Sequence, residues 1–149
     1  MRWFNLVFFA LLIPHVAVAA DSAGFSVRPS AFDFETTLQR VQAEIEARGA
    51  MIVATVRHSD AAESVGMSLQ PAAVVIFGNP RLGTQLMQMD QQIGLDLPLR
   101  ILVWVAAGEE VGVGYRTAEA LLEPHQIDAP ELVNTINTAL DGIAEAASG

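Results

Sequence analysis

The sequence of 149 residues contains no cysteine and no lysine. Without cysteine, the chain has no disulfides, no thiolate nucleophile and no thiolate ligand for a metal. Without lysine, Schiff-base chemistry and lysine nucleophiles are excluded as well. The sequence also lacks the G-x-S-x-G, H-E-x-x-H and P-loop motifs, so the common signatures of hydrolases, zinc proteases and nucleotide-binding proteins are missing.

Positive charge is scarce: eight arginines stand against 17 acidic residues, which gives a net charge of −9. A surface of this charge repels a phosphate backbone, so we expect no nucleic-acid partner. The excess of acidic residues keeps the protein soluble, or it forms a surface that docks onto a basic partner.

Residues 1–20 have the pattern of an export signal. A positive start is followed by the apolar run Trp3–Ile13 and by small residues that form a cleavage site near Ala19 or Ala20. The run is about half the roughly 20 residues needed to cross a bilayer, so membrane attachment would occur only through an uncleaved signal segment. We therefore expect a periplasmic or secreted single domain over residues 21–149, stabilised by packing alone.

Apolar spacing and turn residues predict five strands and two long helices, with short helical inserts between them. The second strand is an apolar run and is expected to be buried. Helices on one face of a mainly antiparallel sheet make an α+β two-layer sandwich. The expected strands are 24–28, 51–56, 72–77, 99–105 and 111–115, and helices are expected after Asp33, Asn79 and Asp128.

Three further local features are predicted in the C-terminal half. Gly112 and Gly114 alternate with apolar residues in the last strand, and they leave a shallow strip that a helix or a second subunit would cover. Asp128 and Glu131 are expected to form a capping box at the start of the final helix. His125, in the linker-like segment 123–129, is expected to be exposed.

Two turn sequences interrupt the apolar strands in the middle of the chain, at a characteristic spacing. They are FGNP at residues 77–80 and LDLP at residues 95–98. With them, the stretch from Ile52 to Tyr115 resembles the domain-of-unknown-function 302 family, also called the TT1751-like domain. The resemblance implies a two-layer β-α-β4-α sandwich, often a homodimer, and no settled activity. It is carried by His58, Gly66, Pro71, 77–80, Gly83, Thr84, Leu86, Met87, 95–98, Trp104 and Tyr115.

The chain departs from this family pattern at two arginines. Arg57 stands where the family usually has aspartate before His58, and Arg116 stands where an acidic residue or asparagine commonly follows Tyr115. Each change replaces a potential hydrogen-bond acceptor by a fixed cation. The chain therefore lacks the carboxylate that would orient His58 in the family pattern.

His58 is the strongest candidate for chemistry because it follows a strand end, where functional side chains often project. It could bind a metal or haem iron, shuttle protons, or bond to nearby backbone. Met87 could be a soft ligand to the same iron, or a core residue; Met89 is expected on the buried face of its helix. Asn79 could face a ligand at the start of that helix, or cap the helix.

Three further candidates complete the set. Asp96 could act with Asp90 as a carboxylate pair, or form a turn. Tyr115 is counted among the candidate ligand-binding residues. Arg81 and Arg100 could hold an anionic group, or lie solvated on the surface.

These features favour a non-enzymatic binding module, a homodimer that holds a small apolar ligand or haem near His58 and Met87. One alternative is a haem- or metal-binding protein in a periplasmic redox or sulfur system, with His58 as ligand. Another is an enzyme that uses His58 as general acid–base, helped by Asp90 or Asp96. The third is a structural or interaction domain, for which His58 would affect stability and little else.

Overall fold

The computed structural model describes residues 24–149, so the predicted export signal over residues 1–20 lies outside the described residues. Five strands, five α-helices and two 3-10 helices (η1 and η2) follow one another in this part of the chain. In order they are β1 (Phe25–Ser30), α1 (Phe34–Ala47), β2 (Met51–Arg57), α2 (His58–Ser64), β3 (Ala72–Gly78), α3 (Pro80–Met89), η1 (Gln91–Leu95), β4 (Leu99–Val105), β5 (Val111–Arg116), α4 (Ala118–Leu122), η2 (Glu123–His125) and α5 (Pro130–Ser148).

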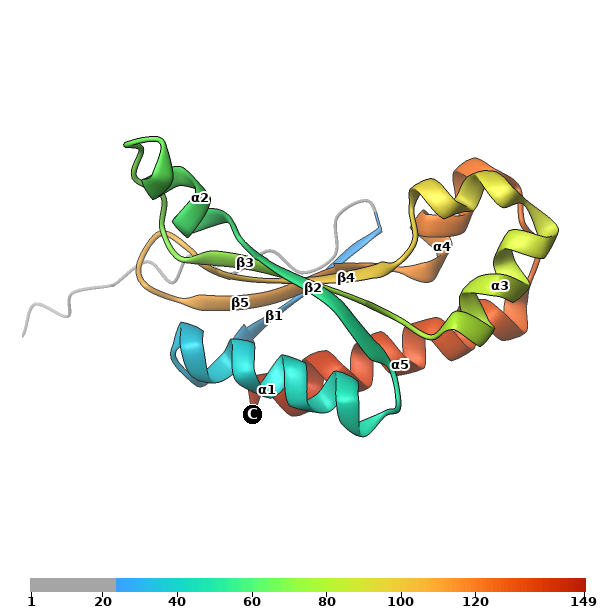
Figure 1. The fold of residues 1–149 in the computed structure, drawn as a ribbon. Helices are drawn as coiled ribbons and strands as arrows, with labels where there is room; N and C mark the ends of the chain where they lie inside the picture. Colours follow the sequence, from blue (N-terminus) through green and yellow to red (C-terminus); the bar gives the residue numbers. More distant parts are fainter. Residues whose placement is uncertain (1–23) are drawn as a thin grey trace, which may run out of the picture.

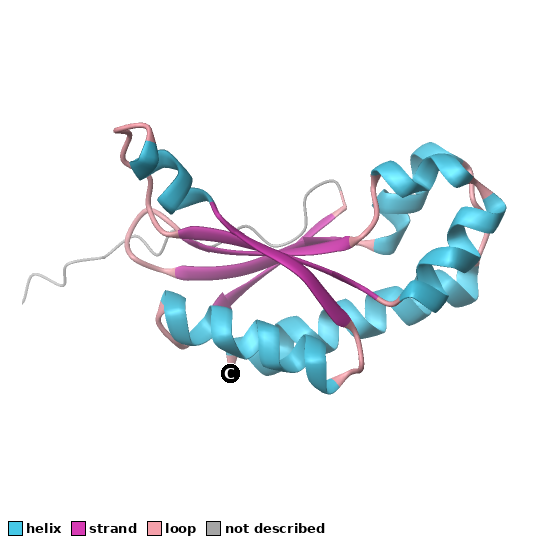
Figure 2. Cartoon of the chain, viewed as in Figure 1, coloured by secondary structure: helices cyan, strands magenta, loops and turns pink. Residues whose placement is uncertain are grey.

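The strands form one sheet in the order β1-β5-β4-β3-β2, and each neighbouring pair is antiparallel. Helices α1 and α5 lie side by side against one face of this sheet (Figures 1 and 2). The shorter helices stand at its two ends, α2 at one and α3 with α4 at the other (Figure 1). This arrangement is the α+β two-layer sandwich that the sequence predicted.

Helix α1 forms because its first turn is capped and its apolar residues recur on one face. Oδ1 of Asp33 accepts a hydrogen bond from the Thr36 N–H at 2.8 Å. Gly49, at φ +71°, ends the helix in the left-handed conformation that glycine adopts without strain. The face that packs on the sheet consists of Phe34, Leu38, Val41 and Ile45.

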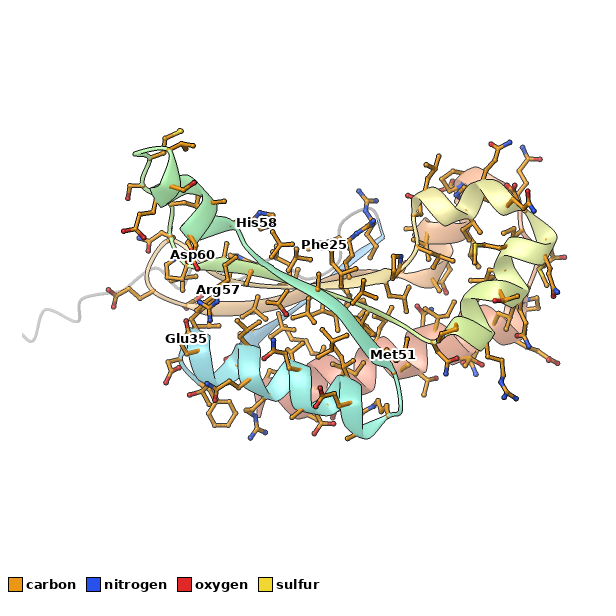
Figure 3. All side chains as sticks on the ribbon, viewed as in Figure 1. Phe25, Glu35, Met51, Arg57, His58 and Asp60 are labelled. Carbon is orange, nitrogen blue, oxygen red and sulfur yellow. The ribbon has the colours of Figure 1, made fainter. Side chains whose placement is uncertain are left out.

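Strand β2 is one of the two edge strands of the sheet, and the prediction that it is buried was wrong. Met51, at the end of β2 away from α2 (Figure 3), exposes 58% of its surface, and Val53 exposes 62%. The pairing with β3 shifts between Ile52 and Ala54, so Val53 lies in an irregularity of the ladder. An apolar run in the sequence indicates a strand. The position of that strand in the sheet decides how much of its surface is buried.

The glycine strip lies on the sheet face opposite α1 and α5. Gly112 pairs with Trp104 across β4 and β5, and a Cβ added to Gly112 would lie 2.7 Å from the indole ring. The ring of Phe25, from β1, covers Gly114 in the same way. Aromatic side chains of the adjacent strands, and not a helix of the facing layer, therefore fill the strip within the described residues.

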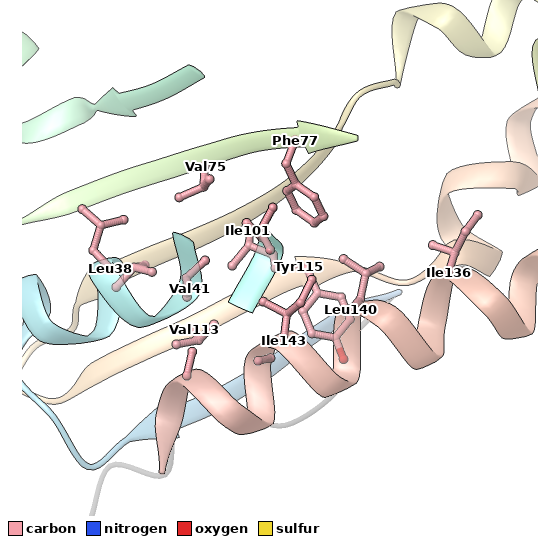
Figure 4. Close-up of a cluster of buried hydrophobic side chains, with 14 of the residues drawn as sticks. Leu38, Val41, Val75, Phe77, Ile101, Val113, Tyr115, Ile136, Leu140 and Ile143 are labelled. Carbon is pink, nitrogen blue, oxygen red and sulfur yellow. The ribbon is translucent and has the colours of Figure 1, made fainter. Parts of the chain in front are cut away.

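The core lies between the other face of the sheet and the two long helices (Figure 4). Burying each of its larger side chains stabilises the fold by about 1.5–3 kcal/mol relative to leaving it exposed. Helix α5 contributes the apolar face that its sequence spacing predicted. The labelled core residues are Leu38, Val41, Val75, Phe77, Ile101, Val113, Tyr115, Ile136, Leu140 and Ile143.

The start of α5 differs from the prediction. The helix begins at Pro130 with Ala129 as its N-cap residue, and no side chain caps it. Proline has no N–H, so one of the donors that a cap would satisfy is already missing. The predicted capping box of Asp128 and Glu131 does not form.

Candidate functional site

The five ligand-binding candidates from the sequence lie at three separate places. Asn79 and Met87 line one cavity. Asp96 and Tyr115 line a second cavity. His58 lines neither, so the structure does not bring it together with Met87.

His58 is an exposed residue at the start of α2. Figure 3 shows it at one end of β2, with Met51 at the other. Met51 lines the first cavity, and roughly 20 Å of extended strand separates the two residues. Within residues 24–149 no group of three or more His, Asp or Glu side chains is placed to hold a metal ion.

Arg57, which precedes His58, is held by helix α1. Its Nη1 and Nη2 donate to the two carboxylate oxygens of Glu35 at 2.7 and 2.5 Å. This bidentate hydrogen bonding lowers the pKa of Glu35. Arg57 therefore ties the end of β2 to α1.

The first cavity, the α3 cavity, has a volume of about 230 Å³ and is lined mainly by apolar side chains. Its walls come from β2, α3, the start of β4 and α5. Asn79 and Thr84 are the polar side chains among its described lining residues. The apolar contacts include Met51, Leu82, Leu86, Met87, Leu97, Leu99 and Ile136.

Local sequence sets the position of α3. Oδ1 of Asn79 accepts from the Arg81 N–H at 3.0 Å, and Pro80 takes the first helical position, as predicted. Leu86 is buried and Met87 is partly exposed at the cavity. Met89 is exposed, so its prediction as part of the buried face was wrong.

The second cavity, the β4–β5 cavity, opens where β4 begins and β5 ends, and has a volume of about 180 Å³. Arg100, Arg116 and Asp96 supply its charges. Tyr115 also lines it, but the Tyr115 hydroxyl donates a hydrogen bond to Oδ1 of Asp141 on α5. Burial of the phenol is the larger cause that raises the pKa of Tyr115, and this hydrogen bond raises the pKa further.

Sequence reasoning missed a polar cluster around His125. Nδ1 of His125 lies 3.2 Å from Oδ2 of Asp90, and Nε2 lies 2.7 Å from Oδ2 of Asp96. The His125 side chain is only 9% exposed, so its prediction as an exposed loop residue was wrong. The hydrogen bond with Asp96 raises the pKa of His125, and the bond with Asp90 adds to this against the opposing effect of desolvation.

This cluster joins η2 to both ends of η1. Because each ring nitrogen of His125 already faces a carboxylate, neither is free to ligate a metal or to take a proton from a substrate. Asp90 and Asp96, proposed from the sequence as helpers of His58, are engaged with His125 instead. The geometry suits a clamp between elements rather than a catalytic group.

The chain matches the family described as "Domain of unknown function DUF302" over residues 26–147. It is a member of the DUF302 family. The fold of this DUF302 domain also matches the crystal structure of an uncharacterized conserved DUF302 protein from Bacillus stearothermophilus, with a TM-score of 0.76 and 14% identity over 85% of this chain and 99% of that one.

Curated relatives of this DUF302 protein include "Fluoride-specific ion channel FluC 1" of Brucella suis biovar 1, 34% identical over 114 residues. "Fluoride-specific ion channel FluC 2" of Brucella melitensis biotype 1 is also 34% identical over 114 residues. The match covers 76% of this chain but 44% and 42% of those proteins, so it spans less than half their length. Among residues 24–149, no helix has the length and apolarity to cross a membrane.

Proposed function

We propose that this DUF302 domain is a non-enzymatic binding module that holds a small apolar molecule in the α3 cavity. The observation that carries the proposal is the lining of this cavity, which is apolar apart from Asn79 and Thr84. Ligand sites combine apolar walls with a few polar groups that orient the ligand in this way. A dry apolar cavity of about 150 Å³ accommodates benzene, so a volume of about 230 Å³ suits a substituted ring.

Methionines in the walls of the α3 cavity support a site that adapts to the shape of its ligand. Met51 and Met87 reach the cavity from different elements, and methionine side chains adjust to ligands of irregular shape. Asn79 and Thr84 belong to the start of α3, where they would orient a polar substituent.

Indole, titrated while amide chemical shifts are recorded, tests the proposal. Leu82→Trp fills the cavity, and we expect it to weaken indole binding at least tenfold. Gln88→Trp, on the same helix but outside the lining, is the matched control and should bind like the parent. Equal indole affinity in a folded Leu82→Trp variant, or no indole-dependent shift in α3 of the parent, would contradict the proposal.

We propose a homodimer that forms through β2 and the segment after α2. Both segments expose apolar side chains. Strand β2 is also an edge strand, and an edge strand readily pairs with another chain. Met67→Asp should shift the mass in solution from dimer to monomer, measured by light scattering. Leu95→Asp, at an exposed apolar residue outside this surface, is the control; a monomeric parent rules the dimer out. The exposed apolar residues are Val53, Val56, Val65, Met67 and Leu69.

We infer export to the periplasm or the medium from the pattern of residues 1–20. Expression of the whole chain in a bacterium, followed by mass spectrometry of the product, checks this. The expected mature chain begins after Ala19 or Ala20 in the exported fraction. A product that keeps Met1 and stays in the cytoplasm contradicts it.

A haem or metal role has less support. His58 lies at one end of β2, whereas Met87, on α3, lines a cavity with Met51 from the other end of β2, so the two cannot ligate one iron within a single chain. The absorbance spectrum of protein mixed with haemin checks this alternative, because ligation by His58 would change the haem bands and His58→Ala would abolish that change.

The Brucella relatives favour a second role, as a domain that acts beside a membrane ion channel. They are named as fluoride channels, and more than half of each lies outside the segment aligned with this chain. Deleting the aligned segment from a Brucella protein and measuring fluoride efflux from liposomes tests this role. We expect altered efflux that this chain restores when added separately; unchanged efflux contradicts it.

A further inference from the structure

Two arginines lie opposite each other on adjacent strands. The antiparallel register ends with Ile101 opposite Tyr115, and continuing it outward by one residue places Arg100 opposite Arg116; both arginines line the β4–β5 cavity. Cβ atoms of directly opposed residues are about 4.5–5.5 Å apart, and like charges in this position repel. Because Ile101 and Tyr115 point toward the helices, both arginines point to the opposite face.

Neither of these arginines has a carboxylate partner in the described part of the chain. Nη1 of Arg100 donates to the backbone carbonyl of Asp96 at 3.3 Å, which fixes its position without neutralising it. With 17 acidic residues against eight arginines, carboxylates are not in short supply. The arginines that do form ion pairs are Arg28, Arg48 and Arg57.

The two guanidinium groups border the β4–β5 cavity, whose floor on the same sheet face is apolar. Leu102 and Gly114 form the middle of this floor, and the ring of Phe25 adjoins it. Asp96 also lines the cavity, but its Oδ2 is engaged by His125. The cavity therefore offers two arginines without a direct ion pair, with Asp96 at its edge, beside an apolar surface.

We propose that the β4–β5 cavity binds a small organic carboxylate, with the carboxylate between Arg100 and Arg116 and a ring-sized apolar body over Leu102 and Gly114. The planar guanidinium fork matches the geometry of a carboxylate and accepts burial better than an ammonium group does. Binding an anion would also relieve the repulsion between the two arginines. This site shares only Leu99 with the described walls of the α3 cavity and does not depend on a ligand being bound there.

Benzoate is the probe, titrated against the protein by calorimetry and by amide chemical shifts. Arg100→Gln and Arg116→Gln should each weaken benzoate binding at least tenfold. Arg81→Gln, an exposed arginine outside this cavity, is the matched control and should bind benzoate like the parent. Benzyl alcohol, with the same ring and no charge, and inorganic phosphate, with charge and no ring, should both bind at least tenfold more weakly.

Circular dichroism of each variant establishes that it is folded before affinities are compared. The proposal is overturned if folded Arg116→Gln binds benzoate as tightly as the parent, or if the parent shows no benzoate-dependent shifts in β4 and β5. Phosphate binding as tight as benzoate would also overturn it, because the apolar floor would then contribute nothing. Leu82→Trp should keep full benzoate affinity, which separates this result from the test of the α3 cavity.

Discussion

Nε2 of His125 lies 2.7 Å from Oδ2 of Asp96, although 29 residues separate them in the sequence. The contact fixes η2 against the segment that leads into β4, and Asp90 holds the other ring nitrogen. A histidine with carboxylates on both sides makes the attachment of this end of the molecule dependent on pH.

The stability of the fold should fall as pH rises above neutrality, because of His125. Its carboxylate partners raise the pKa of His125 in the folded protein, so the folded state holds this proton more tightly than the unfolded chain does. The stabilisation is complete below the unfolded pKa of about 6.5, and it is lost as pH rises through the raised pKa of the folded state. Thermal unfolding measured from about pH 6 to pH 9 should show this fall.

His125→Gln provides the control for that measurement. Glutamine does not titrate, so the variant should be less stable than the parent at the acidic end of the range and should approach it at the alkaline end. Parallel stability curves for the parent and His125→Gln would show that the histidine is not coupled to folding.

Two glycine-to-alanine changes should have opposite effects. In Gly112→Ala the new Cβ would lie 2.7 Å from the Trp104 ring, and we expect a loss of about 1–3 kcal/mol from overpacking. In Gly83→Ala, inside α3, the new Cβ would lie at an ordinary 3.8 Å from Leu97, and alanine should stabilise the helix by about 0.5–1 kcal/mol. Urea unfolding of both variants measures the two effects; a neutral Gly112→Ala would mean that the indole moves aside freely.

Arg116→Gln should make the protein more stable at low ionic strength. The change removes the repulsion between Arg116 and Arg100, and cross-strand pairs contribute about 0.2–1 kcal/mol. The gain should shrink in about 1 M salt, where the screening length is about 3 Å. Urea unfolding at low and high salt measures this gain in stability, with Arg81→Gln as the control. An Arg116→Gln variant less stable than the parent at low salt would mean that Arg116 has a favourable partner.

Tyr115 should ionise at higher pH than a free tyrosine. It is the single tyrosine of the chain, so phenolate absorbance reports this group alone. Burial and the hydrogen bond to Asp141 raise its pKa, and the midpoint should therefore exceed the ordinary value of about 10. Asp141→Asn should bring the midpoint down, because it removes the negative charge next to the phenol.

The raised pKa of Tyr115 also makes the stability of the fold depend on pH. The folded state favours the protonated phenol, so the contribution of Tyr115 is present below about pH 10 and is lost as pH rises through the raised pKa. A midpoint at or below the ordinary value in protein that is still folded would show that the hydroxyl is solvated.

The starts of two helices were predicted correctly, whereas the capping box of Asp128 and Glu131 was not. Asp33 caps α1 and Asn79 caps α3, because each cap depends on backbone geometry within one turn of helix. Asn79 and Met87 share a cavity because one short helix carries both.

The candidate site was predicted less well because its polar partners come from distant segments. Nothing in the spacing of His125, Asp90 and Asp96 indicates that they meet, since the contact requires η2 to fold back onto η1. His58 was expected near Met87, but β2 is extended and carries His58 away from the end at which α3 packs.

The sequence by itself determined the strands and long helices of this protein, the caps of α1 and α3, its family and its excess of negative charge. Only the tertiary structure decided that β2 lies at the exposed edge, that Trp104 covers Gly112, and that Arg100 faces Arg116. The physical reason is that caps and turns are local hydrogen-bonding and steric preferences. Strand order and register, by contrast, are set by the packing of the whole sheet against α1 and α5.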